Sequence, residues 1–517
     1  MVMVNRLREK KWFWLILVVA VFFRFYNLLG LQYYSFDDEL YATMLRRVIV
    51  DHKLLLISPA PSVEISLGPF WYWLSIPIYA FSRFNPIKIV TFGSFFGLLS
   101  TGVLYITGKK LGGSRVGLIA SFLYAGSFLM ALSDRRWWPL SLNAFLVTVA
   151  IYSLYQMIKG KLHFSLPLAI AASFSWHADL TLAIIILAIL MCKVWFRLPL
   201  MHKAYFPGVV FLIFSFLPFG IFEFRHPGAV SGPVLLLVNR MANSRSNSVI
   251  PTDRLSINGV VLSLSHSLFS VPTNAAENYL YPHSAKEVID VPGIFQIMAM
   301  SLFLFPLYLW KNSIKKYRVS LEVLYIFLGA FFAGLVIANL VGKVRISQHY
   351  YVIVWPVIYL LAAFAVDWLI DKKYRFWVVV LGIVFVITNI YALVNSQMRY
   401  RLDDKMQLTN FIVQNLSDKP FSLYGLNDVH LFGGGFGGML LTHNRFPSNR
   451  SYYGLDWVYQ AFSLYAIPVV EDDNFEQVVI IYPSWYVPDW LTYFPAKPMQ
   501  TFQVANMKTT ILRAGDN

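Results

Sequence analysis

The chain has 517 residues, of which 57% are hydrophobic, 17% aromatic and only 14% charged. A soluble globular chain usually carries about 25% charged residues and about 45–50% apolar ones, so the composition excludes an ordinary soluble protein. The formal net charge of +16 would suggest a nucleic-acid partner in a soluble protein. Here the Lys and Arg residues lie in short loops between apolar runs, so we expect a lipid bilayer as partner and no nucleic acid.

The apolar residues come in long runs rather than in alternating patterns, which is typical of membrane-spanning helices. Basic residues and then an apolar run begin the chain without a small-residue cleavage site, which predicts a retained first span and not a removed signal peptide. We predict a mostly α-helical, polytopic transmembrane bundle of about eleven spans of roughly 20 residues each. The predicted spans cover residues 11–29, 87–107, 116–132, 138–157, 162–177, 178–196, 206–222, 293–310, 321–341, 349–367 and 374–394.

The loops between the predicted spans indicate the orientation of the chain. With the N-terminus in the cytoplasm, alternate loops should be rich in Lys and Arg. Counting the apolar stretch 70–81 as a further span would put the later basic loops outside, so we interpret it as a juxtamembrane or re-entrant segment of the first outer loop. The predicted inner loops contain Lys109, Lys110, Arg115, Lys159, Lys161, Lys193, Arg197, Lys203, Lys311, Lys315, Lys316, Arg318, Lys372, Lys373 and Arg375.

This topology predicts two domains of a multi-pass membrane protein. Residues 1–394 are expected to form a transmembrane domain with outer loops at 30–86 and 223–292, and residues 395–517 a small extracytoplasmic C-terminal α/β domain. Strand-like pieces at 421–426 and 477–482 indicate a sheet in the latter. Cys192 is the only cysteine, so the chain forms no intrachain disulfide.

Ionisable residues gather at the outer ends of the predicted spans, on one face of the membrane. Such groups are costly near the bilayer and are functional by default where they line a cavity. Carboxylates together with Arg and His suggest a general base opposite a phosphate-binding cluster. The groups are Asp37, Asp38 and Glu39; Asp134, Arg135 and Arg136; His177 and Asp179; Glu223, Arg225 and His226; and Lys343, Arg345 and His349.

Each group also has a purely structural interpretation. The acids Asp37–Glu39 can cap a helix, because carboxylates favour helix N-termini. Asp134 can form a local ion pair with the two arginines that follow it, and His177 fits a packed, hydrogen-bonded histidine. Arg345 and His349 are spaced to share a helix face, and the alternative is a snorkelling arginine beside an interfacial histidine.

Two further patterns bear on cofactors. The run Gly433–Gly438 lacks the Lys-Ser/Thr and the preceding strand of a phosphate-binding loop, so it predicts a flexible turn. The sequence has no HExxH, CxxC or EF-hand pattern. Carboxylates alone can hold Mg²⁺ or Mn²⁺, so we predict no defined metal site or cofactor and leave a divalent metal open.

Several motifs, in their order and spacing, resemble the GT-C superfamily of membrane glycosyltransferases, and most closely its family 39-like branch of protein O-mannosyltransferases and aminoarabinose transferases. The resemblance covers about residues 11–394. It is carried by RFYNLLG (24–30), DDELYA (37–42), LGPFWYWL (67–74), SDRRWWPLSLNAF (133–145), SWHADLTL (175–182), FLPFGIFEFRH (216–226) and QHYYVIVWP (348–356).

The resemblance implies a plasma-membrane location, a catalytic role for the transmembrane domain 1–394, and a reaction with the residues for it. Family members move a sugar from a polyprenyl-phosphate carrier to an acceptor on the outer face, with an acid of the first outer loop as catalytic base. Counting back from Tyr41 puts Asp37 at that position, whereas matching the Asp-Glu pair literally gives Asp38. The remaining implied roles are donor-phosphate binding by Arg345, His349, Arg135 and Arg136, and an acceptor or second-site role for Asp134, Glu39 and His177.

Other classes of membrane protein remain as alternatives. A transporter or lipid flippase would place ionisable groups within spans and would often have paired halves with broken helices. An O-antigen ligase or polymerase would lack the early acidic loop, and in a non-catalytic scaffold that loop would be dispensable. The WWDYG motif of oligosaccharyltransferases is absent, which argues against transfer of a whole oligosaccharide to asparagine.

Overall fold

The chain is described by a computed structural model at residues 2–58, 65–242, 257–281, 287–311, 317–337, 348–426, 434–445, 447, 476–486 and 498–513. The predicted site residues Lys343 and Arg345, and the first residue of the glycine run, Gly433, lie outside these ranges. The chain divides into two compact units: unit 1 comprises Met1–Tyr26 and Gly93–Ser396, and unit 2 comprises Asn27–Phe92 and Gln397–Asn517.

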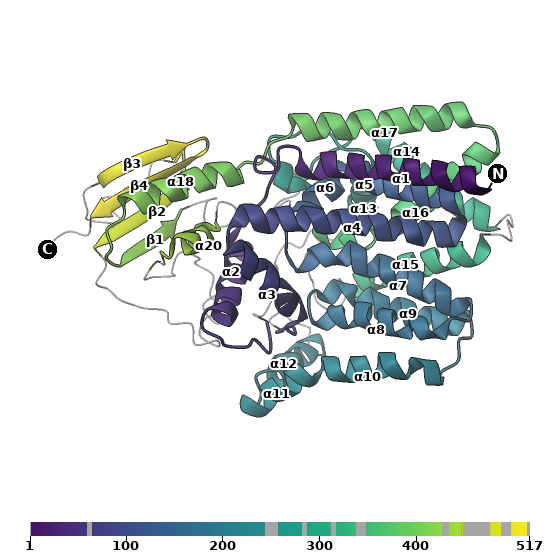
Figure 1. Ribbon diagram of the computed structural model, residues 1–517, viewed down its shortest axis with the longest axis horizontal. Coiled ribbons are helices and arrows are strands. Elements are labelled where there is room, and N and C mark those ends of the chain that lie inside the picture. Colours follow the sequence, from purple (N-terminus) through teal and green to yellow (C-terminus); the bar gives the residue numbers. More distant parts are fainter. Residues whose placement is uncertain are drawn as a thin grey trace. The chain divides into compact units, whose positions relative to one another are not determined.

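Unit 1 is a bundle of α-helices whose long members run in one general direction (Figure 1). Helix α5 packs against α1 and α16, α15 packs against α9, and α8 packs against α7 and α10. The helices are α1 (Val2–Phe25), α4 (Pro86–Gly112, which starts in unit 2), α5 (Ser114–Gly126), α6 (Phe128–Arg135), α7 (Asn143–Ile158), α8 (Ser165–Ser173), α9 (Ala183–Trp195), α10 (Phe206–Ser215), α11 (Leu217–Arg225), α12 (Ser231–Ala242), α13 (Ile257–Leu268), α14 (Gly293–Lys311), α15 (Arg318–Ile337), α16 (Trp355–Asp371) and α17 (Arg375–Asn395).

The predicted count of eleven spans is not confirmed. Six helices in the described residues are long and apolar enough to cross a membrane, or seven if the bent pair α5 and α6 forms one span. Several predicted spans fall instead on apolar helices of 10–17 residues, among them Leu162–Trp176 and Leu180–Trp195. Such helices are about 15–26 Å long at 1.5 Å per residue, which is shorter than a hydrocarbon core of about 30 Å.

The bent pair is a helix broken at Ser127, where α5 and α6 meet at an angle of 69°. Ser127 caps α6, because its side chain accepts a hydrogen bond from the backbone N–H of Met130 at 3.4 Å. The side-chain oxygen of Asn389 on α17 accepts from the N–H of Phe128 at 2.9 Å. A helix break inside an apolar bundle is tolerated when neighbouring side chains satisfy the freed backbone groups. The break positions the Asp134–Arg136 run at the end of α6.

Unit 2 contains the predicted C-terminal sheet. Strands β1 (Phe421–Gly425) and β2 (Gln477–Pro483) confirm the two strand-like pieces, and β3 (Pro498–Val504) and β4 (Met507–Arg513) complete the order β1-β2-β4-β3. The β1–β2 pair is parallel and the other pairs are antiparallel. Helix α18 (Leu402–Asn415) packs on β3 and β4, with the rings of Phe411 and Phe502 stacked at 4.6 Å.

The predicted first outer loop, residues 30–86, belongs to this same unit. It contributes helices α2 (Phe36–Ile49) and α3 (Phe70–Ser82), and α2 packs against α20 (Phe436–Leu440). The backbone N–H of Leu402 donates to the carbonyl of Leu29 at 3.2 Å. The segment 70–81, predicted as a juxtamembrane or re-entrant piece, is therefore a short helix in the compact unit that holds the sheet. Its place relative to a bilayer stays a prediction.

Candidate functional site

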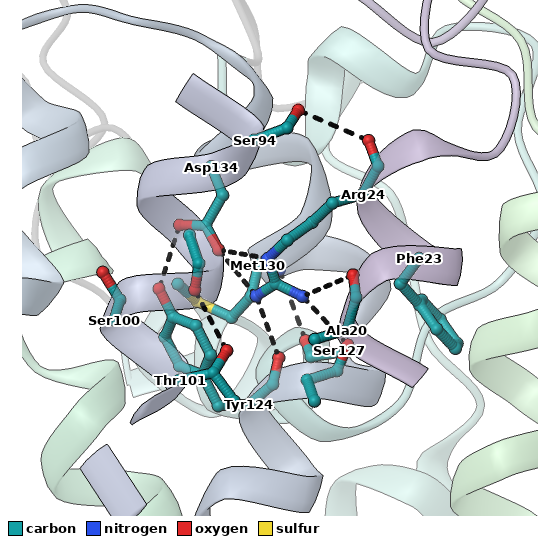
Figure 2. Close-up of polar contacts among 12 residues, drawn as sticks. Ala20, Phe23, Arg24, Ser94, Ser100, Thr101, Tyr124, Ser127, Met130 and Asp134 are labelled. Carbon is teal, nitrogen blue, oxygen red and sulfur yellow. Dashed lines mark hydrogen bonds and ion pairs between the residues drawn. The ribbon is translucent and has the colours of Figure 1, made fainter. Parts of the chain in front are cut away.

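A buried ion pair links the first helix to the end of α6. Arg24 on α1 donates to Oδ2 of Asp134 from Nη2 at 2.6 Å and from Nε at 2.9 Å, and the two residues are 0% and 4% exposed. The hydroxyl of Tyr124 on α5 donates to the other carboxylate oxygen at 2.9 Å. Figure 2 shows the Asp134 carboxylate pointing toward these two partners. Asp134, predicted for an acceptor or second-site role, is thus paired with a residue 110 positions away rather than only with its neighbours.

Gly97 of α4 lies so close to this pair that no side chain would fit at that position. A Cβ on Gly97 of α4 would lie 2.5 Å from Oδ2 of Asp134 and 2.7 Å from Nε of Arg24. The Arg24 guanidinium also donates to the carbonyl of Ala125 at 3.1 Å. Because a buried ion pair needs further hydrogen bonds to offset its desolvation, these contacts make the Arg24–Asp134 pair a junction of α1, α4, α5 and α6.

The two arginines after Asp134 have different environments. Arg135 is 0% exposed and donates from Nη2 to the carbonyls of Phe23 and Tyr26 at 2.7 Å each. A cation favours the C-terminal end of a helix, where carbonyl groups lack helical partners, so Arg135 binds the end of α1. Arg136 donates instead to the hydroxyl of Tyr281 at 3.0 Å. Both arginines were predicted, with Arg345 and His349, to bind the donor phosphate, and of these two Arg136 is the one that shares contacts with His349.

Arg136, Trp138, Tyr281 and His349 form a group that we call the basic aromatic cluster. The guanidinium carbon of Arg136 lies 4.4 Å from the Trp138 ring centroid and 5.6 Å from that of Tyr281. The ring of His349 lies 5.0 Å from Tyr281 and 6.0 Å from Trp138. Stacked rings hold a guanidinium in place by cation–π attraction. The structure therefore brings together Arg136 and His349, two of the four residues predicted to bind the donor phosphate.

The histidine of this cluster has a defined ring orientation. Its Nδ1 lies 3.3 Å from the carbonyl oxygen of Leu280, and its backbone N–H donates to the same carbonyl at 3.1 Å. A carbonyl only accepts, so this contact places the ring proton on Nδ1. The other ring nitrogen, Nε2, makes no hydrogen bond to the described residues. It can accept a hydrogen bond from a ligand, or donate one when the ring is doubly protonated.

His177 and Asp179 each form hydrogen bonds within the helical bundle. Nε2 of His177 lies 2.8 Å from the carbonyl oxygen of Ser215, and the residue is 1% exposed. Asp179 accepts from the backbone N–H of Thr181 at 3.0 Å and from the side chain of Asn143, as a cap of the short helix Leu180–Leu182. The environment of His177 resembles the packed histidine that the sequence offered as the structural alternative, and its predicted second-site role stays a prediction.

The acidic loop, Asp37–Glu39, opens helix α2 of unit 2. The backbone N–H of Ser35 donates to Oδ2 of Asp38 at 2.8 Å, as in a capping box. Glu39 accepts from the backbone N–H of Gly437 at 3.0 Å. Asp38 and Glu39 are 4% and 7% exposed, whereas Asp37 is partly exposed. The sequence could not choose between Asp37 and Asp38, and the structure gives Asp38 a capping contact.

The glycine run packs on this acidic loop. A Cβ on Gly435 would lie 3.0 Å from the carbonyl oxygen of Ser35, and Gly435 has a φ of +97°, in the left-handed region that favours glycine. A Cβ on Gly438 would lie 3.1 Å from the Cα of Glu39. The described part of the run, Gly434–Gly438, was predicted as a flexible turn. Residues 436–438 instead begin helix α20, so the prediction of a turn is wrong there, and the glycines allow a close backbone approach that a side chain would prevent.

A buried lysine on α18 hydrogen-bonds both to the segment before the acidic loop and to the glycine run. Lys405 on α18 is 0% exposed, and its Nζ donates to the carbonyls of Tyr34 and of Gly434, the latter at 2.9 Å. Residues 34, 405 and 434 lie far apart in sequence, so no local pattern could have indicated this contact. Arg24 did give a signal, because an arginine inside a predicted span implies a buried partner.

The described residues contain no group of three or more His, Cys, Asp or Glu side chains placed to hold a metal ion. The three consecutive acids of the loop do not converge, because Asp38 turns to Ser35 and Glu39 turns to Gly437. A divalent ion such as Mg²⁺ or Mn²⁺, left open by the sequence, finds no carboxylate cluster in this part of the chain.

Comparison of the sequence with known proteins gives a distant relative. No family model matches the chain. An uncharacterized protein of Aquifex aeolicus (strain VF5) is 25% identical over 166 residues, which is 32% of this chain and 33% of that protein. The chain therefore spans about a third of the curated relative that it matches.

Among solved structures, ArnT from Cupriavidus metallidurans matches with a TM-score of 0.61, both in the apo state and bound to undecaprenyl phosphate. The match covers 98% of each chain at 14% and 13% identity, respectively. The archaeal oligosaccharyltransferase AglB from Archaeoglobus fulgidus, in complex with an inhibitory peptide and a dolichol-phosphate, matches with a TM-score of 0.50. That match covers 92% of this chain and 69% of AglB at 13% identity.

The chain thus has a fold similar to those of ArnT and AglB. At this level of identity the comparison establishes the fold alone, and a fold by itself does not define the chemistry.

Proposed function

We propose that this protein is an inverting glycosyltransferase that moves a sugar from a polyprenyl-phosphate-linked donor to a protein, lipid or glycan acceptor on the non-cytoplasmic face of the plasma membrane. The observation that carries this proposal is the match of 98% of the chain to ArnT, whose crystal structure holds undecaprenyl phosphate. The acidic loop and the basic aromatic cluster provide the two kinds of group that such a reaction needs.

The first group is a general base, and we assign it to Asp37. The carboxylate of Asp38 caps α2, and that of Glu39 accepts from the backbone of α20. Asp37 lies beside them on a partly exposed position of the first turn of α2, where a substrate hydroxyl can approach it. Asp38 and Glu39 then act as positioning residues that fix the turn carrying Asp37.

The second group stabilises the leaving phosphate, and we assign it to Arg136 and His349. Arg136 is held against Trp138 and Tyr281, and the contact of His349 with Leu280 fixes its ring. A guanidinium that is fixed before the reaction, such as that of Arg136, stabilises developing negative charge without reorganising. His349 donates to the phosphate from Nε2 when its ring is doubly protonated, because its Nδ1 proton is bonded to Leu280. Arg345, predicted for the same role, lies outside the described residues and keeps this role as a proposal. Arg135 and Asp134 support the site from their contacts with α1.

The chemical step needs no covalent enzyme intermediate. The acceptor oxygen attacks the anomeric carbon while its proton passes to the Asp37 carboxylate. The bond between the anomeric carbon and the phosphate oxygen breaks, and both electrons leave with polyprenyl phosphate. A single displacement inverts the anomeric carbon. General-base assistance of this kind contributes about 10²–10⁴-fold to the rate.

Sugar transfer in proteoliposomes tests this assignment. Radiolabelled sugars on a panel of polyprenyl phosphates are presented with an acceptor extract to wild type, Asp37→Asn, Asp38→Asn and the control Asp51→Asn. Asp51 is an exposed acid of the same loop. We expect Asp37→Asn to lose transfer by about 10²–10⁴-fold with unchanged thermal stability, and Asp51→Asn to keep it.

Two outcomes would contradict the proposal at different levels. Loss of transfer in Asp38→Asn but not in Asp37→Asn, with both proteins equally stable, would move the base to Asp38. Absence of transfer from every donor by wild type would contradict the transferase itself and would favour the transporter, flippase or scaffold alternatives.

A further inference from the structure

A cavity of about 390 Å³ lies in unit 2 where α3 ends and α4 begins. It is lined by the turn between these helices and by α18, α20 and the short helix Leu441–His443. Small-molecule sites usually have volumes of about 300–1,000 Å³, so the cavity matches a ligand the size of one or two sugar rings. None of the residues assigned above to the transfer reaction lines it.

The two charged side chains of the cavity wall, Arg83 and Lys88, are both cationic. His443 also contributes to the lining, and no Asp or Glu does. Within the described part of the chain these three side chains make no ion pair with a carboxylate. A concave wall with basic groups of one sign concentrates anions near it, and guanidinium and ammonium groups bind phosphate and carboxylate oxygens directly.

The positions of the basic groups are fixed by the local backbone. Arg83 ends α3 with a φ of +52° and Phe84 follows with +61°, so the chain turns sharply into α4. The Oδ1 of Asn85 accepts from the backbone N–H groups of Ile87 and Lys88 at 3.0 and 3.3 Å. This cap leaves the Asn85 amide N–H₂ as a further donor at the cavity. Asn410 and Thr442 add neutral polar groups to the wall.

The cavity and the acidic loop share one element. Helix α20 contacts Glu39 through Gly437 and Gly438 and lines the cavity through Met439. We propose that this cavity binds an anionic group, a phosphate or a carboxylate, of the acceptor. The identification of the ligand as the acceptor rests on the proposed transferase function, whereas anion binding itself does not depend on it.

Anion binding is tested by charge-selective labelling, which needs no sugar transfer. The only native cysteine, Cys192, is buried, so a Thr442→Cys variant presents one accessible thiol at the cavity. In proteoliposomes we measure the rates of modification by a sulfonated and by a neutral methanethiosulfonate, and the same rates for Gln503→Cys on the exposed part of β3. We expect the ratio of charged to neutral rates to be several-fold higher at 442 than at 503. Adding Arg83→Gln and Lys88→Gln should remove this excess.

Protection of the thiol identifies the source of the anion. Inorganic phosphate, glucose 6-phosphate and vesicles with an anionic phospholipid are compared at matched ionic strength. Slower labelling of Thr442→Cys by any of them, lost in the Arg83→Gln/Lys88→Gln background, supports the site. The effective probe shows whether free phosphate, a sugar phosphate or a lipid headgroup is bound. Equal charge selectivity at 442 and 503, with no protection, would overturn it.

The acceptor role has its own readout. In the transfer assay, Arg83→Gln/Lys88→Gln should raise the KM for the acceptor about tenfold while kcat and the KM for the donor stay unchanged. Lys53→Gln, which removes an exposed charge from the same unit, should leave all three unchanged. Charge-selective labelling without a change in the acceptor KM would overturn the acceptor role alone. Absence of any transfer by wild type would reject the proposed function and leave the labelling result standing.

Discussion

Two runs of three charged residues, Asp134–Arg136 and Asp37–Glu39, are held by different kinds of contact. In the first, Asp134 pairs with a guanidinium from α1 and Arg135 binds the carbonyl end of the same helix. In the second, two carboxylates accept from backbone N–H groups of Ser35 and Gly437. In both runs, two neighbours have structural contacts that fix the backbone of a third residue, Arg136 or Asp37, to which we assign chemistry.

The difference between the runs lies in the cost of removing a partner. A charge left behind in a buried, apolar bundle is far more costly than a backbone N–H that can find another acceptor. Mutations in the Asp134–Arg136 run should therefore act first on folding. Mutations in the acidic loop should act on the local geometry of α2 and α20.

The largest effect is expected for the Arg24–Asp134 pair. Replacing Arg24 by Met removes the charged partner of the buried Asp134 carboxylate, which then keeps the hydrogen bond from the Tyr124 hydroxyl. Breaking a buried ion pair by removing one partner costs about 3–5 kcal/mol. Thermal unfolding in detergent should show this loss, whereas Arg375→Gln, at an exposed position of unit 1, should stay within about 0.5 kcal/mol of wild type.

A double variant distinguishes pairing from simple crowding. Arg24→Met combined with Asp134→Leu removes both charges, and it should be more stable than the sum of the two single effects predicts. Strictly additive losses would mean that the two side chains contribute independently, and the contrast with the acidic loop would then lose its basis.

A smaller effect is expected where the glycine run meets the acidic loop. In Gly437→Ala the new methyl group would overlap the carboxylate of Glu39, which accepts from the N–H of the same glycine. Overpacking typically costs about 1–3 kcal/mol, and because Glu39 must move, transfer should fall as well. Adding Glu39→Ala should recover stability, since it removes the overlapping group. Gly382→Ala is the control, because a Cβ there meets no atom within 4 Å.

The contrast between the runs also shows which contacts a sequence reveals. Strands β1 and β2 were predicted because their apolar residues are contiguous and local. The helical bundle followed from the length of the apolar runs. The break at Ser127 was not predicted, because the apolar run continues through it and the side chain that supports it, Asn389, comes from a distant helix. The predicted span count is not confirmed, and hydropathy alone does not report where a helix ends.

For the candidate site, residue types were easier to predict than partners. The sequence placed Asp134, Arg135 and Arg136 in one cluster, but their three environments depend on residues of α1 and on Tyr281, up to 145 positions away. The glycine run was interpreted as a flexible turn because it lacks the Lys-Ser/Thr and the preceding strand of a phosphate-binding loop. Its actual constraint, the close approach to Ser35 and Glu39, arises from packing between segments about 400 residues apart.

The smallest effect on stability is expected at the cap of α2. Asp38→Ala removes the acceptor that bonds the backbone N–H of Ser35, and loss of such a capping interaction costs about 0.5–2 kcal/mol. Because the cap also fixes the turn that carries Asp37, kcat should fall modestly while the KM for the donor stays near its wild-type value. Asp38→Ser retains a short acceptor and should recover part of both losses. A thermal stability equal to wild type together with an abolished kcat would instead make Asp38 the base, so this variant separates the capping role from the catalytic one.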